Sequence, residues 1–130
     1  MLKNTFDKQE RLSGKKAIDS LFLKGSSLTQ SPLKIIIKAS QSTQIHPCKA
    51  MFVVPKKKFK RAHDRNLLKR RMREAYRLFK NNYYALLNEK ELKANCAILY
   101  VGDKEATYQQ IEIALQALLR QSINKIKPLR

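Results

Sequence analysis

Apolar residues recur along this chain with two different periods, which separates expected helices from expected strands. Four of them follow helical spacing near the start: Ala17, Ile18, Leu21 and Phe22. Gly25 comes directly after this group and can end a helix, since glycine readily adopts the conformation of a helix C-terminus. The pattern therefore predicts a short amphipathic helix that ends before Gly25.

Three later stretches have the character of strands. Residues 33–40 (LKIIIKAS) alternate apolar residues with Lys34 and Lys38, so we expect one buried face and both lysines on the other. Residues 50–54 (AMFVV) are short and rich in branched and aromatic side chains, and residues 94–101 (ANCAILYV) are almost wholly apolar. Each pattern favours a strand over a helix.

Two further helices are predicted in the second half of the chain. The first runs over residues 65–84, with Asp64 as the candidate N-cap. Thr107 and Gln110 have the spacing of a capping box and begin the second. This closing helix has a continuous apolar stripe, formed by Ile111, Ala114, Leu115, Leu118, Leu119 and Ile126.

The order of elements is helix, two or three strands, helix, strand, helix. It predicts an α+β fold, a two-layer α/β sandwich in which three helices pack on a small mixed sheet of about four strands. A chain of 130 residues is long enough for one core, so we expect a single domain. Residues 1–10 are expected to form a flexible N-terminal arm.

The charge of the chain points to a polyanionic partner. There are 28 Lys and Arg residues against 10 Asp and Glu, a formal net charge of +18. No apolar run reaches the roughly 18 residues of a membrane span, so nucleic acid is the favoured partner and no membrane association is expected. The N-terminal sequence lacks the apolar centre of a signal peptide. Cys48 and Cys96 are read as reduced, buried thiols, in keeping with a cytoplasmic location.

Over half of the net charge lies in residues 54–80, where twelve Lys or Arg and two acids give 12 − 2 = +10. At 100° per residue, one side of the expected helix holds Arg65, Asn66, Lys69, Arg70, Arg73, Arg77 and Lys80. The other side holds Leu67, Leu68, Met72, Ala75, Tyr76, Leu78 and Phe79, and Arg71 is the one charge among them. The pattern predicts a helix with one packed side and a cationic ridge that binds phosphates.

No residues in the sequence form a convincing catalytic or metal site. His46 and His63 are the only histidines, and neither sits in a motif that would pair it with a second acid or base. There is no carboxylate cluster with metal-ligand spacing, and three glycines do not make a phosphate-binding loop. We therefore expect any catalysis to come from a partner.

At the basic helix the sequence resembles the protein component of bacterial ribonuclease P. The family has an Arg-Asn-Arg motif, then Lys-Arg, then Arg-Glu-Ala-Phe-Arg. Here residues 65–67 read Arg-Asn-Leu, residues 69–70 Lys-Arg and residues 73–77 Arg-Glu-Ala-Tyr-Arg. Residues 11–27, 54–58 and 107–121 resemble the family's first helix, the strand end before the motif and the closing helix. Leu67 departs from the pattern by replacing the third motif residue.

The resemblance implies a compact α/β fold with a left-handed βαβ crossover around the basic helix. It also implies a protein subunit that assists a catalytic RNA in removing the 5′ leader from precursor tRNA, by binding the leader and stabilising the active RNA conformation. The RNA-facing residues implied here are Lys56, Lys57, Arg65, Asn66, Lys69, Arg70, Arg73 and Arg77. The implied leader cleft, between the first helix and the open sheet face, holds Ile18, Phe22, Lys34 and Lys38.

The same resemblance implies that Mg²⁺ is held mainly by the RNA subunit, with no cofactor bound by the protein alone. The expected partners are the catalytic RNA subunit and precursor tRNA, without an obligate protein partner. Composition leaves two alternatives open: a structural RNA-binding protein of the ribosomal type, or a DNA-binding protein that uses the basic helix in a major groove.

Overall fold

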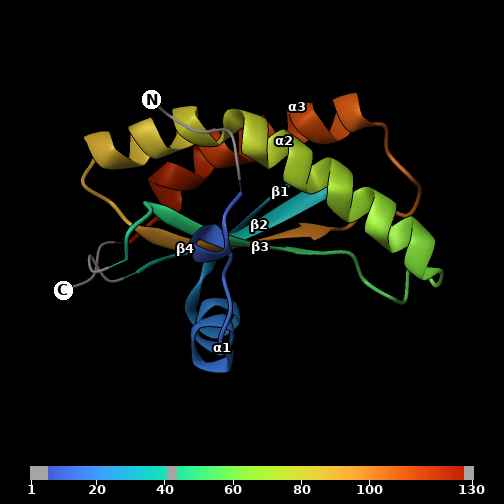
Figure 1. The fold of residues 1–130 in the computed structure, drawn as a ribbon, viewed down its shortest axis with the longest axis horizontal. Coiled ribbons are helices and arrows are strands. Elements are labelled where there is room, and N and C mark those ends of the chain that lie inside the picture. The colour runs from blue at the N-terminus through green and yellow to red at the C-terminus, as the bar shows by residue number, and fades with distance from the viewer. Residues whose placement is uncertain (1–5, 41–43, 128–130) are drawn as a thin grey trace.

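The computed structural model describes residues 6–40 and 44–127 and has helices on both faces of a four-stranded sheet (Figure 1). The main elements are α1 (Lys15–Lys24), β1 (Ser26–Gln30), β2 (Leu33–Ala39), β3 (Cys48–Val53), α2 (Ala62–Glu89), β4 (Ala94–Tyr100) and α3 (Tyr108–Ser122). Short 3₁₀ turns, Lys8–Glu10 and Ile123–Lys125, precede α1 and follow α3. Among the described residues, no helix is both long and apolar enough to cross a membrane.

The sheet is mixed, with strand order β1-β2-β4-β3. β2 runs antiparallel to both β1 and β4, whereas β3 is parallel to β4. Because adjacent parallel strands need a crossover connection, α2 carries the chain from β3 back to the start of β4. The α+β class, the three helices and the element order αβββαβα are confirmed; the left-handed sense of the crossover stays a prediction.

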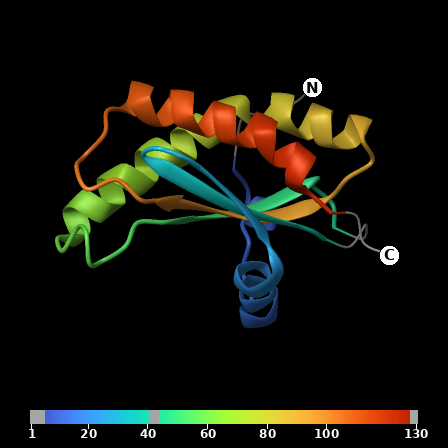
Figure 2. The ribbon, with the colours of Figure 1, turned by 180° about the vertical axis from the view of Figure 1, so that it is seen from behind.

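The two faces of the sheet have different covers (Figures 1 and 2). α2 and α3 lie together over one face, and α1 crosses the other face alone. Positions 33, 35, 37 and 39 of β2 are buried in the core under α2 and α3. Lys34, Ile36 and Lys38 alternate with them and so project toward the α1 side, where Ile36 joins a smaller cluster around Leu12 and Leu21. The predicted placement of the two lysines is confirmed.

The basic helix is longer than predicted. It begins at Ala62 after the N-cap Arg61 and ends at Glu89, so Asp64 is not the N-cap. Asp64 instead lies in the first turn, where its negative charge interacts favourably with the positive end of the helix dipole. The capping box before α3 is confirmed: the Thr107 hydroxyl accepts from the Gln110 amide at 3.2 Å, and the Gln110 side chain accepts from the Thr107 amide at 2.9 Å.

The two cysteines meet in the core between β3 and β4. Cys48 and Cys96 are free and fully buried, and their sulfur atoms lie 3.6 Å apart. Contact with Cys48, together with burial, raises the pKa of the Cys96 thiol. Since the thiolate is the reactive form, these are packing residues, as predicted from the sequence.

Phe6 and Glu10 of the predicted flexible arm are packed against the core, whereas residues 7–9 are exposed; residues 1–5 of that arm lie outside the described chain. The Phe6 ring makes edge contacts with the Phe52 and Tyr76 rings, each with centroids 5.6 Å apart. Glu10, only 1% exposed, forms an ion pair with Lys80, whose Nζ lies 2.9 Å from Glu10 Oε2. Tyr84 donates to the same carboxylate oxygen at 2.6 Å.

This contact also corrects the expected face of α2. Lys80 falls on the cationic side by angle, but it is 4% exposed because it is needed to neutralise Glu10. Leu78, expected in the packed half, is 47% exposed. Placing residues by their angle around the helix assumes that each side of α2 has the same surroundings along its whole length. The N-terminal segment covers α2 only at part of its length, near Lys80.

Burial alone would raise the pKa of Glu10, but hydrogen bonds from the Asp7 amide, Tyr84 and Lys80 outweigh it and lower the pKa. Burial, together with the adjacent Glu10 carboxylate, raises the pKa of Tyr84, which therefore stays protonated and able to donate. A carboxyl group with a lowered pKa in the folded state stabilises the fold above its unfolded pKa, about 4.3 for Glu. That stabilisation is lost as the pH falls through the folded value.

We predict that Lys80→Met lowers the free energy of unfolding by about 3 to 5 kcal/mol, because the Glu10 carboxylate is left buried without its counter-ion. Urea unfolding at neutral pH measures the change, and Lys90→Met, at an exposed lysine that follows α2, is the control. Equal stability of the two lysine variants would show that the ion pair contributes nothing.

Glu10→Gln should also reduce the loss of unfolding free energy that accompanies a fall in pH below about 4.3.

Candidate nucleic-acid interface

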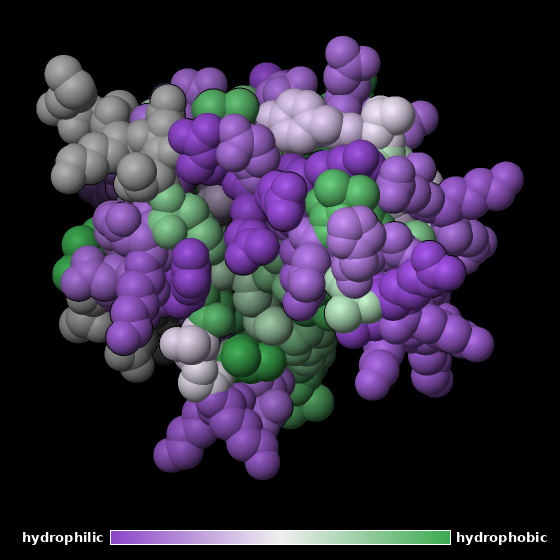
Figure 3. Space-filling view, turned by 45° about the vertical axis from the view of Figure 1, so that its right-hand side comes forward, coloured by the Kyte–Doolittle hydropathy of each residue, from purple (hydrophilic) through white to green (hydrophobic). Residues whose placement is uncertain are grey.

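The first half of α2 presents a row of basic side chains to solvent. Arg70, Arg73 and Asn66 are exposed, and Lys69 is half-buried on the same side of the helix. Lys69 and Arg73 are four residues apart, or about 6 Å along the helix axis. Hydrophilic residues cover most of the face in Figure 3, with a band of hydrophobic residues in its lower centre above α1. Because the opposite side of α2 is packed against the core, the backbone positions of these cations are fixed.

Arg65 has a structural task besides its charge. Its guanidinium Nη1 donates to the carbonyl oxygens of Phe59 and Lys60, each at 2.8 Å. Lys58 likewise donates to the Val101 carbonyl at 2.7 Å and pairs with Asp103 at 3.0 Å. The Arg65 bonds hold the basic loop between β3 and α2 against the start of the helix, and the Lys58 contacts tie the same loop to the segment after β4.

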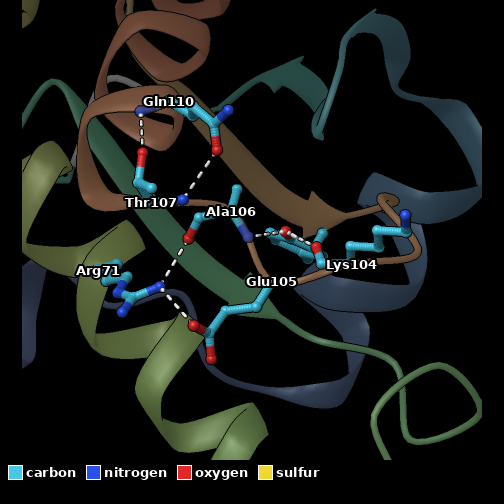
Figure 4. A network of polar contacts seen from close by, with 7 residues as sticks. Arg71, Lys104, Glu105, Ala106, Thr107 and Gln110 are labelled. Carbon is cyan, nitrogen blue, oxygen red and sulfur yellow. Dashed lines mark hydrogen bonds and ion pairs between the residues drawn. The ribbon is translucent and has the colours of Figure 1, made fainter.

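Arg71 is the charge that falls on the apolar side of α2, and Figure 4 shows why. Its guanidinium donates to the Ala106 carbonyl at 2.6 Å and lies 3.5 Å from the Glu105 carboxylate. The Ala106 amide in turn donates to the Tyr100 hydroxyl at 2.8 Å. Arg71 thus ties α2 to the segment that leads from β4 into α3, which is a folding role the sequence pattern did not reveal.

Arg77 lies at the edge of the basic face and is partly neutralised. It donates from Nε to Glu74 Oε2 at 3.2 Å, three residues earlier on the helix. The hydrogen bond from Arg77 lowers the pKa of the Glu74 carboxyl, so the pair stays ionised at neutral pH. Arg77 consequently offers less charge to a polyanion than Arg70 or Arg73.

Lys56 and Lys57 are exposed in the turn after β3, on the loop that Arg65 holds. The structure therefore brings most of the predicted RNA-facing residues onto one loop and one helix. Asn66, Lys69, Arg70 and Arg73 extend this group along α2. We call the following six residues the basic face: Lys56, Lys57, Asn66, Lys69, Arg70 and Arg73.

The predicted cleft residues lie on the α1 side of the sheet. Phe22 is 43% exposed and is not a core residue, whereas Ile18 packs partly into the small cluster under α1. Lys34 and Lys38 are half-buried on β2. Lys38 lines a pocket of about 230 Å³ between α1 and the sheet. The sequence reasoning missed Lys49 on β3, although it alternates with buried Cys48 and Ala50 and so faces the same side.

The two histidines cannot act together on one phosphate. His63 is in the first turn of α2, and the His46 ring lies 6.1 Å from the ring of Tyr84, which is 21 residues further along the same helix. At 1.5 Å per residue that separation is about 30 Å. His46 also approaches Asp7 and Glu10, with ligand atoms within 4.8 Å, but the Glu10 carboxylate is already bound by Lys80 and Tyr84.

Comparison with known proteins identifies the family to which this chain belongs. The sequence model of the family described as "Ribonuclease P" matches residues 6–122. The chain belongs to this family. The Ribonuclease P protein component of Porphyromonas gingivalis is 32% identical over 112 residues, which cover 86% of this chain and 82% of the relative. That of Chlorobaculum tepidum is 42% identical over 81 residues, covering 60% of this chain and 53% of the relative.

Solved structures of the family have the same fold. The RNase P protein of Staphylococcus aureus superposes with a TM-score of 0.70 at 20% identity, over 87% of this chain and 94% of the other. The RNase P protein of Thermotoga maritima gives 0.64 at 19% identity, over 86% and 96%. The family resemblance seen in residues 65–77 is confirmed, and the helix that carries the motif is the one that carries the basic face.

Arg70 and Arg71 are neighbours with opposite tasks, which gives a matched test of the basic face. Arg70→Gln should reduce the slope of log affinity against log salt for an RNA by about 0.7 to 0.9, because one phosphate contact is lost. Arg71→Gln should leave the slope unchanged and lower the free energy of unfolding by about 1 to 3 kcal/mol, through its lost hydrogen bonds. Filter binding at several salt concentrations and urea unfolding measure the two effects. Identical slopes for wild type and Arg70→Gln would contradict the assignment.

Proposed function

We propose that this protein is the subunit of ribonuclease P that assists a catalytic RNA in the endonucleolytic removal of the 5′ leader from precursor tRNA. The match of the Ribonuclease P family over residues 6–122 carries the proposal. The ribosomal-type and DNA-binding alternatives are not favoured, because this match spans the basic helix and the elements on both sides of it.

The basic face is the proposed contact with the RNA subunit. A folded RNA presents phosphates at fixed positions, and a rigid helix can meet them without losing much conformational entropy on binding. Lys69, Arg70 and Arg73 supply charge, while exposed Asn66 can hydrogen-bond a phosphate or a 2′-hydroxyl. Arg65 contributes mainly by holding the loop that bears Lys56 and Lys57.

The α1 side of the sheet is the proposed binding place of the single-stranded leader. Phe22 leaves part of its ring exposed beside Ile18, one helical turn earlier on α1, so a base can stack there. Lys34 and Lys38, with Lys49 on β3, project from the sheet on the same side and can bind the leader's phosphates. An aliphatic residue at position 18 leaves Phe22 as the main stacking surface.

Bond breaking is assigned to the RNA subunit, with Mg²⁺ held mainly by RNA. Among the described residues the histidines are far apart, and one of the two carboxylates close to His46, that of Glu10, is used in the buried ion pair. The protein's part is to bind and orient: it lowers the repulsion between two RNA backbones by supplying positive charge between them. Such a role fits a cytoplasmic protein.

The purified chain, freed of RNA, should not cleave precursor tRNA. Added to the ribonuclease P RNA of the same organism, it should permit accurate 5′ processing at a magnesium concentration where the RNA alone is slow, since protein cations replace part of the metal's charge neutralisation. Gel analysis of the released leader measures this. Cleavage that persists after nuclease treatment and repurification of the protein would overturn the proposal.

Phe22→Ala should weaken binding of precursor tRNA by about 5- to 100-fold in the presence of the RNA subunit, through loss of base stacking. Binding of mature tRNA, which has no leader, should change little. Leu23→Ala is the matched control, because Leu23 is the next residue on α1 and is 80% exposed. Equal losses for precursor and mature tRNA would mean that Phe22 does not contact the leader.

A further inference from the structure

A second small pocket opens at the β3 edge of the sheet, between α2 and the N-terminal segment. It has a volume of about 210 Å³ and is lined by Phe6, Arg11, Leu12, Ala50, Met51, Phe52, Lys69 and Arg73. Pockets for whole small molecules begin at roughly 300 Å³, so this one suits a single planar ring. None of the residues assigned above to the leader cleft lines it.

The apolar part of the pocket offers aromatic surface. Phe6 and Phe52 are both only partly buried, and their rings meet edge to face with centroids 5.6 Å apart. The Arg11 guanidinium lies 5.5 Å from the Phe6 ring centroid. Aromatic faces and guanidinium planes are the surfaces on which unpaired bases stack in proteins that bind single-stranded RNA.

The polar part of the pocket is wholly cationic. Arg11, Lys69 and Arg73 line it and no acidic residue does. By contrast, the larger pocket of about 690 Å³ beside the start of α3 is lined by Asp103 and Glu105 together with Lys104, so its acids outnumber its one cation. Of these two pockets, the smaller one is therefore the better match for an anionic ligand with a planar apolar part.

The walls of the pocket are held in place before any ligand binds. The Leu12 amide donates to the Ala50 carbonyl at 2.9 Å, which extends the sheet beyond β3. The buried Glu10–Lys80 pair fixes the residue before Arg11 to α2. Since a preformed pocket loses little entropy on binding, a single stacked base can contribute most of its interaction energy.

We propose that this pocket binds one unpaired nucleotide of an RNA, with its base against Phe6 and Phe52 and its phosphates on Arg11, Lys69 and Arg73. This inference rests on the proposed function and extends it, because it gives the basic face a second mode of contact. The nucleotide can come from the RNA subunit or from the leader of precursor tRNA, and the experiment separates these sources.

The first measurement compares a uridine octamer with an octamer of the same length that keeps the backbone but lacks the bases. Phe52→Leu keeps an apolar side chain but removes the aromatic face. It should weaken binding of the uridine octamer by about 5-fold or more and leave the abasic octamer unchanged. Equal effects on both probes, or no effect on either, would overturn the inference.

Arg11→Gln tests the pocket with a residue whose side chain is exposed, so folding is not at risk. Its matched control is Arg120→Gln. Arg120 is also exposed, and its guanidinium lies 5.1 Å from the ring centroid of Phe79, but it does not line the pocket. Arg11→Gln should weaken octamer binding at least 3-fold more than Arg120→Gln, since it removes a pocket contact as well as one charge. Equal losses would show that only net charge matters.

The source of the nucleotide is found by ultraviolet crosslinking of the wild-type protein in three samples: with the RNA subunit, with precursor tRNA, and with both. A crosslink from Phe6 or Phe52 to one nucleotide identifies the RNA that fills the pocket. Crosslinks confined to other residues in all three samples would reject the pocket, while unchanged processing activity in the same preparation would leave the proposed function standing.

Discussion

Four ion pairs among the described residues decide which basic side chains hold this fold together and which are left for an RNA. They join Lys58 to Asp103, Arg71 to Glu105, Arg77 to Glu74 and Lys80 to Glu10. A chain with 28 cationic and 10 acidic side chains cannot neutralise itself. Four of the ten carboxylates therefore fix a structural cation. Ten of the 28 cations lie within residues 56–73, and only two of those ten, Lys58 and Arg71, belong to these pairs.

The most deeply buried of these pairs determines how the N-terminal segment packs against α2 and β3. Glu10 and Lys80 are almost fully removed from water, which is costly unless both charges are well paired and hydrogen-bonded. Tyr84 and the Asp7 amide complete the set of donors to Glu10. As a result the N-terminal segment is fastened to α2, and the edge of β3 is covered by Leu12, in place of an open strand that could pair with another chain.

Much of the fold could be predicted from the sequence because its signals are local. The alternation in residues 33–40, the apolar stripe of the closing helix and the Thr107–Gln110 box each depend on neighbouring residues alone. All three are present in the structure, except that Ile126, predicted in the stripe, lies beyond the end of α3. The basic face was foreseeable for the same reason. The roles of Lys80, Arg71 and Arg65 were not, because each is set by a partner distant in sequence or by a loop carbonyl whose position no pattern encodes. Glu10 gave no sign of burial in a stretch that is otherwise polar.

The continuity of α2 has a consequence for how RNAs are told apart. The helix runs unbroken for 28 residues, and its second half is anchored in the core by Tyr83 and Leu87. The helix therefore sets the spacing of the Cα atoms of Lys69, Arg70 and Arg73, and only their side chains can adjust to a partner. The contact proposed above would therefore favour an RNA whose backbone presents phosphates at that spacing over one of the same composition with a different bend. Discrimination of this kind would depend on the curvature of a folded RNA and would tolerate wide changes in base sequence.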